Sequence, residues 1–145
     1  MEYDIFDKTL VVRLEPGEDI VSSLLKLAKK EDIKLADVRG LGAVNDAELG
    51  LFDIDSKIYH TNEFKNENFE IVSLTGNISE MDGEKYLHTH MAIADKDGHV
   101  FGGHLSKGII SATAEIFVSV VNGEIDRKHS EKIGLNLFKF SNGKH

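Results

Sequence analysis

The sequence predicts an α/β protein of the α+β type, with one principal helix and a mainly antiparallel, strongly curved sheet of about seven strands. Short β-rich runs follow one another through short turns, which favours antiparallel pairing. Only one segment has strong helical periodicity, and a single helix cannot cover both faces of such a sheet. The sheet must therefore curl on itself, or another subunit must cover its open face. Apolar residues on both faces of several strands favour oligomerisation.

The chain opens with one short strand and this helix. The strand covers residues 10–14 and ends at Glu15-Pro16-Gly17. The helix is expected from about Glu18 to Lys30, with acidic residues in its first turn and lysines in its last, which complements the helix dipole. Its apolar face repeats at helical spacing and comprises Ile20, Leu24, Leu27 and Ala28.

The segment from residue 35 to 52 contains Gly40-Leu41-Gly42. A dinucleotide-binding loop would need a third glycine and a helix opening at that point, and the sequence has neither. These glycines instead predict close backbone packing or a bulge in a strand. Residues 58–64 are expected to form a short edge strand, and residues 65–68 a polar turn.

The second half of the chain is predicted to be almost entirely strand. Residues 69–78 form a strand that returns through Met81-Asp82-Gly83 into a histidine-rich strand. Residues 109–121 alternate between apolar and polar positions and are rich in β-branched residues, which favours a strand although their opening could be helical. Residues 135–140 form a closing strand, followed by a polar tail over 141–145.

Residues 86–105 contain four of the seven histidines and the clearest turn in the chain. Asp95-Lys96-Asp97-Gly98 is typical of a type I turn followed by a left-handed glycine, the pattern of a three-residue hairpin loop with a bulge. If Asp95 and His99 close this loop, His90 lies opposite His104. His88 shares the face of His90, because side chains two residues apart on a strand point the same way.

Three imidazoles would then converge on one side of the hairpin. We expect His88, His90 and His104 to hold a divalent metal, with zinc the best match, because neutral imidazoles suit zinc and three leave a fourth position open. The alternative is a polar interface in which the rings form hydrogen bonds across strands or subunits, and the sequence weighs the two about equally. His99 is expected to be solvated, and His60, His129 and His145 receive no role.

The sequence identifies no catalytic residue, and it offers one candidate for a general base. A metal-bound water would need a nearby general base. Glu115 could serve if strand polarity brings it to the histidine face, although a charge on a strand surface is the more common reading of a lone carboxylate. No nucleophile elbow, phosphate-binding loop or paired-carboxylate motif is present.

Composition narrows the class of protein. The 145 residues predict a single domain with its core over about 8–140. The absence of cysteine excludes disulfides and thiolate metal sites. No apolar run approaches the ~20 residues of a membrane helix, and the first residues lack the basic start of a signal peptide, so we expect a cytoplasmic protein without membrane partners. Seventeen basic residues face twenty-five acidic ones, and only three are arginine, which disfavours tight DNA binding.

Three phrases resemble the plants-and-prokaryotes-conserved (PPC) domain in their expected order. They are Asn68-Phe69-Glu70-Ile71-Val72-Ser73-Leu74-Thr75-Gly76, Leu87-His88-Thr89-His90-Met91-Ala92-Ile93-Ala94-Asp95 and Gly98-His99-Val100-Phe101-Gly102-Gly103-His104-Leu105. The resemblance runs from about residue 17 to 140. It implies an α/β fold, a homotrimer and a DNA-binding or transcription-regulating role.

Two departures separate this chain from the plant members of that family. Plant members join the domain to an AT-hook, a short Arg-Gly-Arg-Pro reader of the minor groove, whereas the one proline here is Pro16, preceded by Glu15. Plant members also typically lack the full histidine set. We therefore expect a stand-alone prokaryotic type without an AT-hook.

Two functions from different classes follow. The first is a trimeric binding module that acts in regulation, through DNA or a protein partner. The alternative is a metal-dependent enzyme or small-molecule sensor that uses the His88, His90 and His104 cluster.

Overall fold

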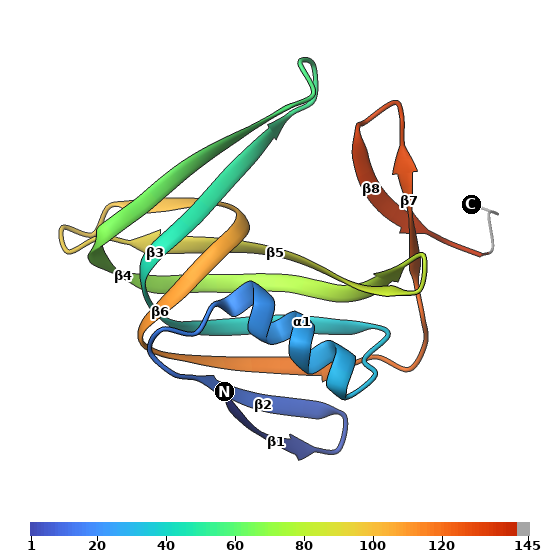
Figure 1. Ribbon diagram of the computed structural model, residues 1–145, viewed down its shortest axis with the longest axis horizontal. Coiled ribbons are helices and arrows are strands. Elements are labelled where there is room, and N and C mark those ends of the chain that lie inside the picture. The colour runs from blue at the N-terminus through green and yellow to red at the C-terminus, as the bar shows by residue number, and fades with distance from the viewer. Residues whose placement is uncertain (142–145) are drawn as a thin grey trace.

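The computed structural model describes residues 1–141, which form one helix and eight strands (Figure 1). These elements follow each other in the order β1 (Glu2–Phe6), β2 (Thr9–Leu14), α1 (Ile20–Lys30), β3 (Ala36–Asp53), β4 (Ile58–Met81), β5 (Glu84–Ala94), β6 (Val100–Val120), β7 (Asp126–Ser130) and β8 (Leu135–Lys139). The first residue of the predicted polar tail is described, and the others, including His145, lie outside the described residues.

Six strands form one antiparallel sheet in the order β1-β2-β6-β3-β4-β5, while β7 and β8 form a separate hairpin. An additional pairing between β5 and β6 closes a circuit through β3, β4, β5 and β6. The predicted mainly antiparallel, strongly curved sheet is confirmed, and the sheet curls because its long strands pair with different neighbours along their length.

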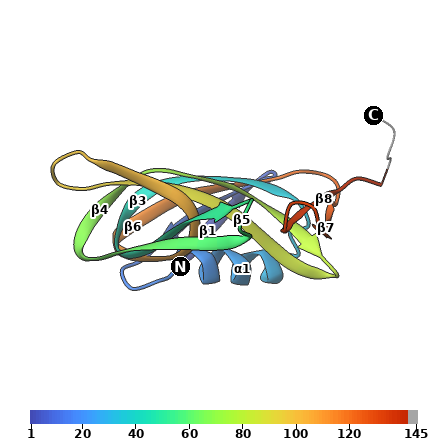
Figure 2. The same ribbon diagram turned by 90° about the horizontal axis from the view of Figure 1, so that it is seen from above.

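The helix covers one face of the sheet (Figure 2). Its buried face is the predicted one, Ile20, Leu24, Leu27 and Ala28. The predicted start was two residues too early: Asp19 is the N-cap, and its carboxylate accepts a hydrogen bond from the Ser22 amide at 2.8 Å. A capping carboxylate satisfies a free amide of the first turn, so Asp19 starts the helix from outside it. The described helix is too short and too polar to cross a membrane.

The predicted polar turn at residues 65–68 is wrong. Strand β4 runs through this segment and pairs with β3 on both sides of it. Asn66 has φ +65°, and the register shifts between Val44 and Asp46 of the partner strand. The polar residues therefore form a bulge in a continuous strand, because a bulge and a turn favour the same left-handed conformation. The expected short edge strand over 58–64 is the first part of this long strand.

The Gly40-Leu41-Gly42 segment packs tightly against β6, as predicted. The pairing register of β3 shifts on both sides of Gly42. A Cβ atom at Gly42 would lie 2.3 Å from the carbonyl oxygen of Thr113. Only a glycine permits this approach, so the two glycines allow β3 to lie close to β6.

Two hairpins project beside the sheet and face each other (Figure 1). One is formed by the end of β3 and the start of β4, which are joined by residues 54–57, and the other is formed by β7 and β8. Their tips are joined by Lys57, whose Nζ donates hydrogen bonds to the carbonyl oxygens of Lys132 and Ile133 at 2.7 Å each. The histidine strands lie at the base of the space between the hairpins.

Candidate metal centre

The β5–β6 loop fixes the position of the histidines. The Asp95 amide donates to the His99 carbonyl oxygen at 3.0 Å, and the Gly98 amide donates to the Asp95 carbonyl oxygen at 3.1 Å. Gly98 has φ +83°, as the predicted bulged loop requires. Counting back from this closure, the ladder sets His90 directly opposite His104, as predicted.

The three predicted imidazoles gather in one cluster. Ring centroids lie 5.2 Å apart for His88 and His90, 5.3 Å for His88 and His104, and 5.7 Å for His90 and His104. One nitrogen of each ring lies within 4.8 Å of the others. His88 and His104 are partly buried, and His90 is exposed.

The residues present fit a shared cation. Two zinc–nitrogen bonds of about 2.0–2.1 Å span at most about 4.2 Å, so small side-chain rotations suffice to close the observed separation. Within residues 1–141, none of the three rings forms a hydrogen bond with another side chain or with the backbone. Their nitrogens are thus not engaged by the rest of the described chain.

The electrostatics of the cluster favour neutral imidazoles. Burial lowers the pKa of His88 to about 4, with smaller contributions from the positive charges of His104, Arg127 and His90. Burial also lowers the pKa of His104, helped by the charge of His90. A neutral ring keeps a lone pair for a metal, so at neutral pH these two rings need lose no proton to bind one.

The cluster opens into a pocket of about 620 Å³ between the two hairpins. Its walls are mostly aromatic and aliphatic, and among the described residues that line it none is Asp or Glu. Besides the three histidines, the lining comprises Gly50, Leu51, Phe52, Tyr59, Asn77, Tyr86, Gly103, Arg127, Leu135, Asn136, Leu137 and Phe138.

Arg127 is a pocket residue that the sequence did not reveal. Its side chain is buried, with 5% of the residue exposed, although β7 is a wholly polar strand. The guanidinium lies 4.5 Å from the centre of the Tyr86 ring and 4.3 Å from that of Phe138. A buried arginine in a polar segment carries no periodic signal, so only the folding back of the β7–β8 hairpin identifies it.

The structure does not bring Glu115 to the histidines. This residue lies in the C-terminal half of β6, opposite Arg13 of β2 and Leu41 of β3. It lines a different surface pocket. Strand polarity alone could not place it, because β6 is long and its register shifts between His104 and Glu115. The cluster therefore lacks the general base that the sequence offered.

The other histidines lie apart from the cluster. His99 is exposed, as expected, and its Nδ1 lies 3.0 Å from Asp95 Oδ2 within the loop. His60 is exposed on β4, opposite Leu51, and the Nδ1 atom of His129 lies 3.1 Å from Asn136 Oδ1.

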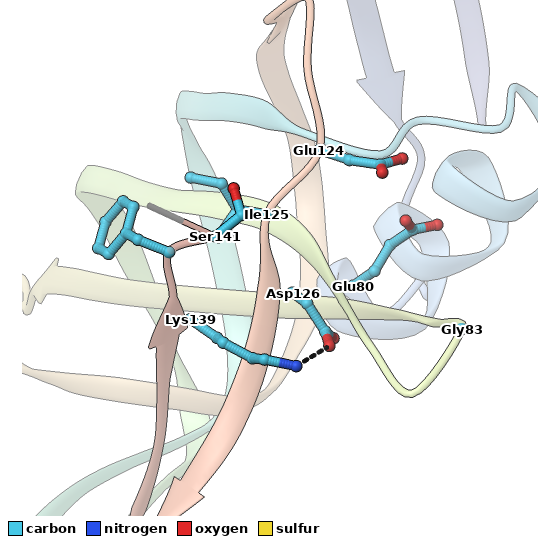
Figure 3. A pocket seen from close by; sticks show the side chains of 8 residues that line it. Glu80, Gly83, Glu124, Ile125, Asp126, Lys139 and Ser141 are labelled. Atoms are coloured by element: carbon cyan, nitrogen blue, oxygen red, sulfur yellow. Dashed lines mark ion pairs between the residues drawn. The ribbon is translucent and has the colours of Figure 1, made fainter. Parts of the chain in front are cut away.

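A second pocket, of about 400 Å³, lies between the β4–β5 turn and the β7–β8 hairpin (Figure 3). Glu80, Glu124 and Asp126 give it an acidic lining, and Asp126 is 3.7 Å from Lys139 Nζ. None of the three clustered histidines lines it. We therefore place the candidate site at the histidine pocket.

Solved structures of about 30% identity share this fold over nearly their whole length. The chain is similar to a candidate DNA-binding protein from Bacteroides thetaiotaomicron, with 30% identity, a TM-score of 0.94 and coverage of 97% and 98% of the two chains. It is similar to a metal-containing protein from Archaeoglobus fulgidus, with 34% identity, a TM-score of 0.86 and coverage of 96% and 97%. A PPC protein from Pyrococcus horikoshii shows 32% identity, a TM-score of 0.85 and coverage of 97% and 96%.

A curated relative is much longer than this chain. Over 111 residues the chain is 33% identical to the bifunctional protein GlmU of a Synechococcus strain, and the match spans 74% of this chain but 16% of that protein. The family profile described as the Plants and Prokaryotes Conserved (PCC) domain matches residues 1–122, a range that includes all three clustered histidines. The chain belongs to the Plants and Prokaryotes Conserved domain family.

Proposed function

We propose that the protein is a homotrimeric metal-binding module whose function centres on a zinc ion held by His88, His90 and His104. The observation that carries the proposal is the convergence of three imidazoles, with their ligand nitrogens within 4.8 Å of one another, at the base of a pocket. None of these rings is engaged in a hydrogen bond with another described residue, which argues against the polar-interface alternative within one chain.

Zinc is the favoured ion because the donor set consists of imidazole nitrogens alone. Three nitrogen ligands with an open fourth position are typical of zinc sites that bind an exogenous molecule. Calcium and magnesium prefer oxygen ligands, and the described lining of the pocket contains no carboxylate. The similarity to a metal-containing archaeal protein of 34% identity supports a metal in this fold.

Binding is a better reading of the site than hydrolysis. When bound, the metal supplies a positive charge and a coordination position for an oxygen or nitrogen of another molecule. The two hairpins surround that position with mostly apolar side chains. No described carboxylate lines the pocket to accept a proton from a substrate, so its residues bind and orient a ligand.

A homotrimer is supported by exposed apolar side chains on the outer face of the sheet. Leu41, Val72 and Phe117 are 57%, 57% and 45% exposed and lie on three neighbouring strands, β3, β4 and β6. Burial of such a surface between subunits stabilises an oligomer. The family resemblance supplies the trimeric stoichiometry.

DNA binding is the second candidate function. Two similar structures, of 30% and 26% identity, are described as candidate DNA-binding proteins. The charge of this chain opposes the transfer of that role, since a net charge of −8 repels phosphate. Regulation through a protein partner is compatible with both the trimer and the charge.

Zinc titration of the metal-free protein tests the proposal. Isothermal titration calorimetry should give about one zinc per chain, and each of His88→Ala, His90→Ala and His104→Ala should abolish this stoichiometric binding. His129→Ala, which removes a histidine outside the cluster, should leave binding unchanged. Retention of tight zinc binding by the three cluster variants would place the metal elsewhere and defeat the proposal.

A further inference from the structure

We propose that the histidine pocket binds a small organic carboxylate, with its carboxylate group against Arg127 and its apolar body between the two hairpins. The proposal rests on the proposed function, because the metal at the histidines adds a second positive charge that faces the same ligand. It names the chemical class of molecule that the module recognises.

Arg127 carries a buried charge without an acidic partner. Its guanidinium donates to Ser79 Oγ, Asn77 Oδ1 and the Asn136 carbonyl oxygen, each at 2.8 Å. All three acceptors are neutral, and among residues 1–141 no carboxylate lies within ion-pair distance of Arg127. Buried charges in proteins are normally paired, so the missing counter-charge points to an anion from outside the chain.

The guanidinium also retains hydrogen-bonding capacity. Arginine has five N–H groups, and the three observed bonds use one on each of Nε, Nη1 and Nη2. One N–H on each terminal nitrogen stays available. The planar arginine fork matches the two oxygens of a carboxylate, and the Tyr86 and Phe138 rings hold its plane in place.

The rest of the pocket selects for an apolar body. Leu51, Phe52 and Tyr59 line it from the β3–β4 hairpin, and Leu135, Leu137 and Phe138 line it from β8. A volume of about 620 Å³ leaves room for an organic molecule of several carbon atoms. An inorganic anion would satisfy Arg127 but leave these side chains without contacts.

The hairpin that supplies Arg127 is held over the histidines by contacts at both of its ends. Arg127 anchors its base to Asn77 and Ser79 of β4, and Lys57 joins its tip to the β3–β4 hairpin. This hairpin lies beyond residues 1–122, the range matched by the family profile. The arginine that would bind the carboxylate therefore lies outside the matched range, and the metal ligands lie within it.

Calorimetry on the zinc-loaded protein with three probes tests the inference. Benzoate is the carboxylate, benzamide its neutral counterpart, and inorganic phosphate the anion without an apolar body. We expect saturable benzoate binding that is roughly tenfold or more tighter than that of either other probe, since a charge-assisted hydrogen bond contributes this much. Arg127→Gln should reduce the benzoate affinity to that of benzamide. Arg39→Gln, at an exposed arginine that does not line the pocket, should not change it.

Two safeguards keep the test decisive. Arg127→Gln removes contacts that anchor β7, so Arg127→Lys, which keeps the charge but not the fork, should show an intermediate loss. The comparison of benzoate with benzamide uses the wild type and depends on no variant.

A failure of the ligand inference can be distinguished from a failure of the proposed metal-binding function. Equal affinity for benzoate and benzamide in a protein that carries one zinc per chain overturns the ligand inference and leaves the metal function standing. Tighter binding of phosphate than of benzoate overturns it in favour of an inorganic anion. A wild type that binds no zinc overturns both.

Discussion

His90 lies directly opposite His104 in the antiparallel ladder between β5 and β6, with their ring centroids 5.7 Å apart. The pairing depends on the loop closed by Asp95 and His99, because each residue of the ladder is counted from that closure. A shift of one residue would turn His104 to the other face of the sheet and separate the imidazoles. The loop residues therefore determine the candidate metal site from a distance.

Replacement of His90 should remove the metal and destabilise the protein. His90→Ala deletes one of the three ligands, whereas His99→Ala changes an exposed loop residue and should do neither. At free zinc 100 times its dissociation constant, bound metal contributes about 2.7 kcal/mol to the free energy of unfolding, which corresponds to roughly 5 °C or more in melting temperature. Calorimetric melting with and without chelator measures the difference. Equal melting temperatures for wild type and His90→Ala would show that His90 does not bind a stabilising metal.

The metal-free protein should lose stability as the pH falls below the pKa of an unperturbed histidine. The pKa of His88 is lowered to about 4 in the folded chain, while an unfolded histidine titrates near 6.5. Between these values the unfolded state binds more protons, so the free energy of unfolding rises with pH and levels off above about 6.5. Denaturant unfolding from pH 4 to 8 should show this slope, and His88→Asn should reduce it. A flat profile for wild type would refute the assigned environment of His88.

The proposed trimer should depend on the outer face of the sheet. Phe117→Asp places a charge among the exposed apolar side chains there and should dissociate the assembly. Lys26→Asp, on the exposed side of α1, should leave the mass unchanged. Light scattering of both variants gives the masses. A monomeric wild type at micromolar concentration would contradict the proposed assembly.

Duplex DNA should bind weakly or not at all. In the proposed trimer, three chains of −8 would together carry a net charge of −24, which would add long-range repulsion from phosphate. Fluorescence anisotropy with a labelled duplex at physiological salt measures the affinity, and a fall in affinity with added salt would indicate phosphate contacts. A dissociation constant below the micromolar range would show that the second candidate function is the correct one.

Gly42→Ala should lower stability without removing the metal ligands. The added methyl group would lie 2.3 Å from the Thr113 carbonyl oxygen, so β3 and β6 would have to separate. Overpacking of this kind typically costs about 1–3 kcal/mol. Gly102→Ala is the matched change, because its nearest neighbour would be 3.2 Å away, and its cost should be smaller. Urea denaturation compares the two, and equal stability of the variants would refute the close-packing account of Gly42.

The histidine register could be predicted from the sequence because it depends on a short segment. The Asp95–Gly98 turn fixes its own conformation, and the count from it to His90 and His104 needs no long-range information. The helix face was predictable for the same reason, since its period is local.

Features that depend on long-range contacts could not be predicted. Strand β1 is an edge strand with mostly exposed side chains, and β7 is wholly polar, so neither has the alternation that marks a strand. Arg127 is buried only because β7 packs against β4 and β8. The bulge at Asn66 resembles a turn locally, and only its pairing with β3 shows that the strand continues.

Elemental analysis of the purified protein tests the central claim most directly. Mass spectrometry of the metals in wild-type protein, normalised to chain concentration, should give about one zinc per chain, and His90→Ala protein prepared alongside should contain almost none. Chelator should lower the melting temperature of the wild type alone. Wild-type protein without stoichiometric metal, whose melting is unchanged by chelator, would show that the three histidines do not form a metal site.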